Sequence, residues 1–181
     1  MKKLKTYFVS ILLSSLLFSC QSGEQKMISE IQSLENEFSK EEFIPDKGVA
    51  IKLIDLYTEF SEKYPEHEQT ADYIFKAGSL CMSVNFPTKA VEFFDKIINN
   101  YPDYERHPES YFMKAFVYDS QLNNLPLARQ SYEALIEKYP EHELAEQARQ
   151  LIPLLGKNLE EIIDGFEKEN NKDSVDLKEE I

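Results

Sequence analysis

The sequence repeats itself at a nearly constant interval, and this recurrence constrains the fold more than any other feature. A shift of 38 residues lays the stretch from Ala71 to Pro102 over the stretch that follows. It pairs Ile74 with Phe112, Ala77 with Ala115, Ala90 with Ala128, Phe94 with Tyr132, and Tyr101-Pro102 with Tyr139-Pro140. A shift of 37 residues the other way pairs Ala90, Phe94 and Pro102 with Leu53, Tyr57 and Pro65. Such recurrence is typical of solenoids, in which each repeat buries its apolar face against the next.

Each repeat has the pattern of two helices joined by a short turn. Apolar residues recur at spacings of three and four, as on one face of a helix. The expected helices of the first repeat run from Lys26 to Lys40 and from Asp46, the expected N-cap, to a stop at Pro65. Those of the second run from about Thr70 to Val84 and from Pro87 to Asn99. With 8 Pro and only 5 Gly in 181 residues, the composition also favours an all-helical chain.

Small residues stand where the two helices of a repeat must approach each other. The predicted core of the second repeat is Ile74, Ala77, Gly78, Cys81, Ala90, Phe94 and Ile97. Gly78, Ala90, Phe94 and Pro102 have the spacing of the small, small, aromatic and Pro positions of the tetratricopeptide repeat, and the chain resembles that family from about Asp46 to Gly156. The resemblance implies an all-α helical-hairpin solenoid of about two and a half repeats plus capping helices.

The third repeat and its cap depart from the pattern in one place. Phe116 replaces Gly78, which predicts a wider local spacing of the helices. A capping helix is expected after Pro140, with Gly156 as its stop. Asn158 with Glu161 predicts the cap of one more short helix, and Leu159, Ile162, Ile163 and Phe166 are expected to fold back on the capping helix.

The first twenty residues have the layout of a secretory signal. A basic start precedes an apolar run from Tyr7 to Phe18, which is too short to span a membrane. Leu17-Phe18-Ser19-Cys20 resembles a bacterial lipoprotein processing site, which implies acylation of Cys20; an ordinary secretory signal is the alternative. The expected divisions are a signal peptide over 1–19, a tether over 20–25, the tetratricopeptide-like domain over 26–166 and an acidic disordered tail over 167–181.

Charge and missing motifs exclude several classes of function. A net charge of −13 disfavours nucleic acid as a partner, because binding to phosphates needs clustered Lys and Arg. His142-Glu143 opens like a zinc-protease helix, but Glu146 stands where the second His ligand must be. We therefore expect no enzyme, cofactor, metal or small-molecule substrate.

The resemblance also suggests where a protein or peptide partner would bind. The concave groove of such repeats is lined by the first helix of each hairpin. By correspondence of position, the candidate groove residues are Phe75, Lys76, Ser79, Met82, Met113, Lys114 and Val117. The Met residues suit an apolar or extended peptide, since their side chains adapt to varied shapes.

Lengthened repeats that end in Tyr-Pro behind a lipoprotein signal resemble the BamD-type and YbgF-type envelope proteins, and the pattern is expected in lipoproteins of the Bacteroidota. The resemblance implies a lipid-anchored adaptor at the outer membrane, on its periplasmic face, in outer-membrane assembly or maintenance. The alternatives are a cell-wall or division accessory factor of the YbgF type, which usually lacks the anchor, and an unrecognised hydrolase.

The lipoprotein hypothesis can be tested by metabolic labelling with a radioactive fatty acid. The Cys20→Ala variant is expected to lose the label completely, because the thiol is the site of acylation. Label that persists in the variant would exclude Cys20 as the anchor.

Overall fold

The structure is a computed structural model that describes residues 23–39 and 47–164, and every regular element in these ranges is a helix. The chain forms two compact units, an N-terminal unit up to Tyr104 and a C-terminal unit from Glu105. The boundary falls between the second and third sequence repeats. No helix among the described residues is long and apolar enough to cross a membrane.

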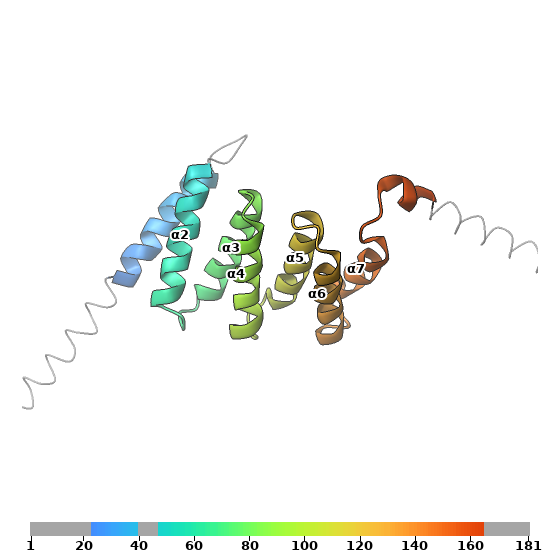
Figure 1. Cartoon of the computed structure of the whole chain (residues 1–181). Coiled ribbons are helices and arrows are strands. Elements are labelled where there is room, and N and C mark those ends of the chain that lie inside the picture. The colour runs from blue at the N-terminus through green and yellow to red at the C-terminus, as the bar shows by residue number, and fades with distance from the viewer. Residues whose placement is uncertain (1–22, 40–46, 165–181) are drawn as a thin grey trace, which may run out of the picture. The chain divides into compact units, whose positions relative to one another are not determined.

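The described part of the N-terminal unit, residues 23–39 and 47–104, contains four helices. Residues 23–39 form the first, followed by α2 (Lys47–Lys63), α3 (Thr70–Ser83) and α4 (Pro87–Asn100). α3 packs on both α2 and α4, and α3 with α4 forms the predicted hairpin of the second repeat (Figure 1). Pro87 lies in the first turn of α4, as predicted, where the missing backbone donor has no helical partner to lose.

The α3–α4 contact is as close as the small residues predicted. All seven predicted core residues of this repeat are buried. A Cβ atom added to Gly78 would lie 3.0 Å from the ring of Phe94, a separation that real Cβ atoms rarely show. Cys81 is a buried free thiol, as expected, and burial raises its pKa to about 11.

The leading helix of the first repeat covers α2 and α3. Its apolar face lies against a buried cluster that contains Ile31 from this helix, Phe60 from α2 and Tyr73 from α3. Met27, Leu34 and Phe38 pack on the same cluster, and with Ile31 they have the spacings of four, three and four residues that predict a helix over Lys26–Lys40. The proposed N-cap Asp46 lies outside the described residues.

The C-terminal unit repeats the hairpin and then caps it. Its elements are α5 (His107–Ser120), α6 (Leu125–Lys138), α7 (Glu143–Leu151) and the short 3-10 helix η1 (Ile152–Leu154); residues 159–164 are also helical. α6 packs on α5 and on α7. The core cluster joins Ala115, Tyr132, Leu135 and Ala148, so α7 closes this hairpin as predicted. The predicted all-α class of helical hairpins is thus confirmed.

The predicted stop and cap after α7 are also confirmed. Gly156 has a positive φ of 76°, which favours glycine, and a Cβ there would lie 2.6 Å from the side chain of Leu125. Asn158 and Glu161 form a reciprocal capping box: each side chain accepts a hydrogen bond of 2.9 Å from the backbone N–H of the other.

One expectation for the C-terminal unit needs correction, and the wider helix spacing expected at Phe116 stays a prediction. Leu159 and Ile163 are 73% and 49% exposed, so they do not fold back on the capping helix. Phe166 lies outside the described residues. Phe116 is 41% exposed, so its bulk is accommodated largely at the surface, whereas Gly78 at the matching position of α3 is buried.

Tyr132 carries a buried hydroxyl that makes no hydrogen bond among the described residues, and burial raises its pKa to about 12. An unpaired buried hydroxyl costs about 1–3 kcal/mol. Tyr132→Phe is therefore expected to raise the free energy of unfolding by about 1 kcal/mol, measured by urea denaturation with circular dichroism.

Phe94→Tyr is the matched control for this substitution, because Phe94 occupies the equivalent buried position of the second repeat. It introduces a hydroxyl beside Gly78 and is expected to destabilise. A loss of stability in Tyr132→Phe would show that the hydroxyl is satisfied in solution.

Candidate protein-binding surface

Two of the seven candidate groove residues are core residues. Phe75 is 1% exposed, and its ring packs against the rings of Phe94 and Tyr104 at centroid distances of 5.5 and 6.2 Å. The assignment of Phe75 to a groove is wrong for this physical reason. A sequence signal was available: from Tyr73 to Gly78 only Lys76 is polar, as in a helix that is buried on more than one face.

Val117 is the second correction. It is fully buried, whereas the neighbouring Phe116 is 41% exposed. α5 therefore turns the smaller, β-branched side chain inward and the larger ring outward. Positional correspondence with the family could not show this, because it assigns faces from an average repeat.

Four of the candidates remain accessible in part. Ser79 and Met82 on α3, and Met113 and Lys114 on α5, are half-buried. The Ser79 hydroxyl donates to the carbonyl oxygen of Phe75 at 3.0 Å. Met82 and Met113 thus place one half-buried, flexible methionine side chain in each unit.

Lys76 is held by carboxylates of its own chain. Its ammonium group lies 2.9 Å from Glu35 of the leading helix and 2.9 Å from Asp72 of α3. The hydroxyl of Tyr57 donates to the same Glu35 oxygen at 2.7 Å, and the hydroxyl of Tyr104 donates to Asp72 at 3.1 Å. These contacts join the leading helix, α2, α3 and the end of the N-terminal unit.

Electrostatics in this network favour the charged pair. Burial lowers the pKa of Lys76, but the hydrogen bonds and charges of Glu35 and Asp72 outweigh it, so the pKa is raised. Burial and the hydrogen bond to Glu35 raise the pKa of Tyr57. Lys76 is therefore a structural cation that ties the leading helix to α3, and its charge is already neutralised within the chain.

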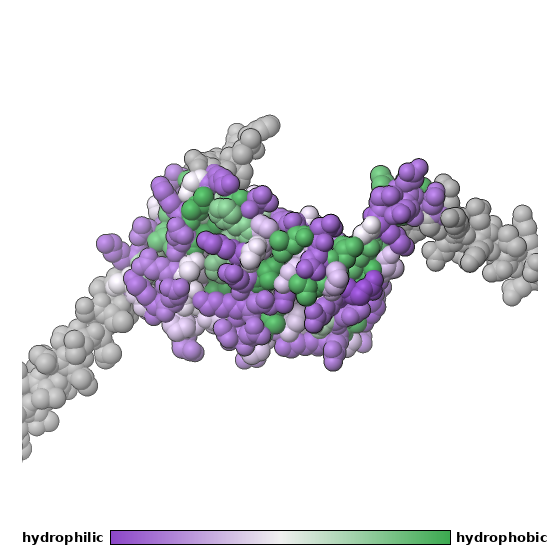
Figure 2. Space-filling view, in the orientation of Figure 1, coloured by the Kyte–Doolittle hydropathy of each residue, from purple (hydrophilic) through white to green (hydrophobic). Residues whose placement is uncertain are grey.

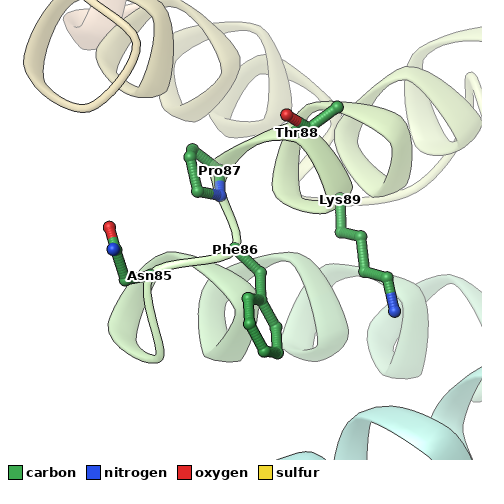
Figure 3. A pocket seen from close by; sticks show the side chains of 5 residues that line it. All are labelled: Asn85, Phe86, Pro87, Thr88 and Lys89. Atoms are coloured by element: carbon green, nitrogen blue, oxygen red, sulfur yellow. The ribbon is translucent and has the colours of Figure 1, made fainter.

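Sequence reasoning missed a hollow at the α3–α4 turn. It has a volume of about 350 Å³ and is lined by Asn85, Phe86, Pro87, Thr88 and Lys89. Figure 3 shows the Phe86 ring and the Lys89 side chain extending to the same side of the turn. The ammonium groups of Lys89 and of Lys47, the first residue of α2, lie 5.8 and 5.4 Å from the centroid of the Phe86 ring.

Apolar residues also reach the surface of the C-terminal unit. Phe116 on α5 and Leu127 on α6 are 41% and 36% exposed. Figure 2 shows hydrophobic patches over these helices in a face that is otherwise largely hydrophilic. Isolated exposed apolar residues are normal on proteins, so this surface does not by itself define a site.

His142, whose sequence context raised the possibility of metal chemistry, caps a helix. It is the N-cap of α7, and its Nδ1 accepts from the backbone N–H of Leu144 at 3.2 Å. His67 lies in the turn before α3, where its Nδ1 accepts from the backbone N–H of Gln69 at 3.1 Å. Both side chains thus hold the turns between successive hairpins. Residues 23–39 and 47–164 contain no group of three His, Cys, Asp or Glu side chains placed to hold a metal ion.

Comparison with known proteins identifies one repeat. A family model described as tetratricopeptide repeat matches residues 109–142, which cover most of α5, all of α6 and the turn up to His142. No curated protein matches the chain. The chain thus contains a tetratricopeptide repeat on the α5–α6 hairpin, and such repeats are protein-interaction structures.

The burial of Phe75 changes the expected effect of mutating it. Phe75→Ala and Phe94→Ala are both expected to lower the free energy of unfolding by about 3–5 kcal/mol, as truncations of large core residues do. Urea denaturation of both variants gives the comparison. If Phe75→Ala lowered the free energy of unfolding several-fold less than Phe94→Ala, the assignment of Phe75 to the core would be wrong.

Proposed function

We propose that this chain is a non-catalytic, lipid-anchored scaffold that binds a protein or peptide partner in the bacterial cell envelope. The observation that carries the proposal is the tetratricopeptide repeat on the α5–α6 hairpin. The α3–α4 hairpin has the same order of helices and the same small and aromatic core positions. Proteins built from such hairpins use the first helix of each to present a binding surface.

Each unit has its own proposed contact surface, the accessible part of α3 in the N-terminal unit and the accessible part of α5 in the C-terminal unit. Met82 and Met113 are the apolar contacts, and Ser79 and Lys114 are the polar ones. Methionine fits this role because an unbranched thioether can adapt to several partner shapes. We do not include Lys76 among the residues that would contact an acidic partner, because Glu35 and Asp72 already neutralise its charge.

The cellular location rests on the N-terminal sequence. Cys20 stands at the position that lipoprotein processing would acylate, and it lies outside the described residues. Several acyl chains on one cysteine would hold the protein stably, because two lipid signals already suffice for anchoring. The absence of Asp after Cys20 resembles outer-membrane sorting, and we place the protein on the periplasmic face, with a role in outer-membrane assembly or maintenance.

The two alternatives differ in testable features. A cell-wall or division factor of the YbgF type would share the helical hairpins but usually lacks an acylated cysteine. A hydrolase would need a reacting group, and the Nδ1 of His142 is engaged by the N–H of Leu144 in capping α7. The structural role of His142 favours binding over catalysis.

Site-specific photo-crosslinking in the native cell tests the proposal. A photoreactive amino acid at Met82 or Met113 is expected to give discrete higher-mass adducts, because these side chains would lie against the partner. The same probe at Glu92 of α4 or Glu133 of α6, exposed positions on the second helices of the two hairpins, is the control.

Adducts that depend on the Met82 and Met113 positions, and that persist after detergent extraction of the envelope, would support the scaffold. Equal adducts at all four positions, or none at Met82 and Met113, would contradict it. Loss of the adducts in Cys20→Ala would show that the anchor brings the chain to its partner.

A further inference from the structure

We propose that the hollow at the α3–α4 turn is a docking site for an acidic segment of a protein partner, with Lys47 and Lys89 receiving its carboxylates and Phe86 receiving a neighbouring apolar side chain. This inference rests on the proposal that the chain binds a protein. It adds a site at the α3–α4 turn, directly after Met82, and the chemistry of the partner segment that this site would take.

Two positive charges lie over one aromatic ring, and within residues 23–39 and 47–164 no carboxylate pairs with either of them. The ammonium groups of Lys47 and Lys89 both lie less than 6 Å from the Phe86 centroid, within the range of a cation–π contact. Neither ammonium forms an ion pair with a carboxylate of residues 23–39 or 47–164. Lys76, in contrast, has two carboxylate partners in the same unit.

Helix stability does not explain the two lysines. Lys47 is the first residue of α2 and Lys89 the third of α4, and neither helix has an acidic residue in its first turn. Cations are unfavourable at this end of a helix, where the dipole is positive. The chain as a whole carries a charge of −13, so two neighbouring lysines that have no carboxylate partner among the described residues are a local exception to its composition.

The dimensions and composition of the hollow select the class of ligand. A volume of about 350 Å³ is at the small end of the range of ligand sites, enough for one or two side chains. The Phe86 ring, which extends to the same side of the turn as Lys89, provides apolar contact beside the charge (Figure 3). Two lysines are too few to hold a membrane surface, which takes clusters of about four to eight, or a nucleic acid backbone. A short peptide with alternating carboxylates and apolar side chains fits.

Binding can be measured by fluorescence anisotropy with the folded chain and a labelled six-residue peptide of alternating Glu and Leu. The double variant Lys47→Gln, Lys89→Gln is expected to weaken binding about five- to tenfold, since each exposed ion pair contributes modestly. Lys47→Arg with Lys89→Arg is expected to retain binding, and higher salt to weaken binding to the unmodified chain.

The matched control is Lys52→Gln with Lys63→Gln, which removes the same charge from exposed lysines of α2 and is expected to change the affinity less than twofold. If both double variants weakened binding equally, the effect would come from net charge alone, and the site would be excluded. The site would also be excluded if a peptide of alternating Gln and Leu bound as tightly as the Glu–Leu peptide. If anionic phosphatidylglycerol vesicles bound more tightly than the Glu–Leu peptide, and this binding depended on Lys47 and Lys89, the ligand would be a lipid surface and the proposal of an acidic protein segment would be wrong.

A second arm separates this site from the scaffold proposal. A photoreactive amino acid at the exposed Thr88 is expected to give an adduct in the cell that the Lys47→Gln, Lys89→Gln change removes. Peptide binding without adducts at Met82 and Met113 would leave the site standing and contradict the scaffold surface. Adducts at Met82 and Met113 without peptide binding would support the scaffold surface and contradict the site at the α3–α4 turn.

Discussion

The close approach of two helices within a repeat is the constraint on which the structure depends. In the α3–α4 hairpin it is set by Gly78, because a Cβ there would lie 3.0 Å from the ring of Phe94. Ala77 and Ala90 are both fully buried, and their small side chains allow the two helices to stay close along the rest of the contact. The large ring of Phe94 can then fill the space that the small residues leave, and close packing of this kind supplies most of the stability of a helical hairpin.

The α5–α6 hairpin meets the same constraint with different residues. Ala115 and Ala128 keep the small positions, but Tyr132 replaces Phe94 and brings a hydroxyl into the core without a partner among the described residues. Phe116, at the position of Gly78, is largely at the surface. The family match nevertheless falls on this hairpin, which shows that similarity to a family pattern and quality of packing are separate properties of a repeat.

The sequence predicted what depends on local spacing. The helices, the core of the second repeat, the glycine stop at Gly156 and the Asn158–Glu161 capping box all follow from residues within a few positions of each other. It did not predict the contacts between distant residues, such as Glu35 with Lys76 or Lys47 with Phe86. The contact of the Phe75 ring with Tyr104 was missed for the same reason, although the apolar run from Tyr73 to Gly78 already indicated a helix buried on more than one face.

The start of the leading helix limits how far the folded chain could stand from a lipid surface. Residue 23, only three residues after Cys20, already belongs to the leading helix. Three extended residues span at most about 11 Å. A protein acylated at Cys20 would therefore hold this end of its leading helix within about 11 Å of the anchored cysteine, so the lipid surface and the leading helix would be neighbours.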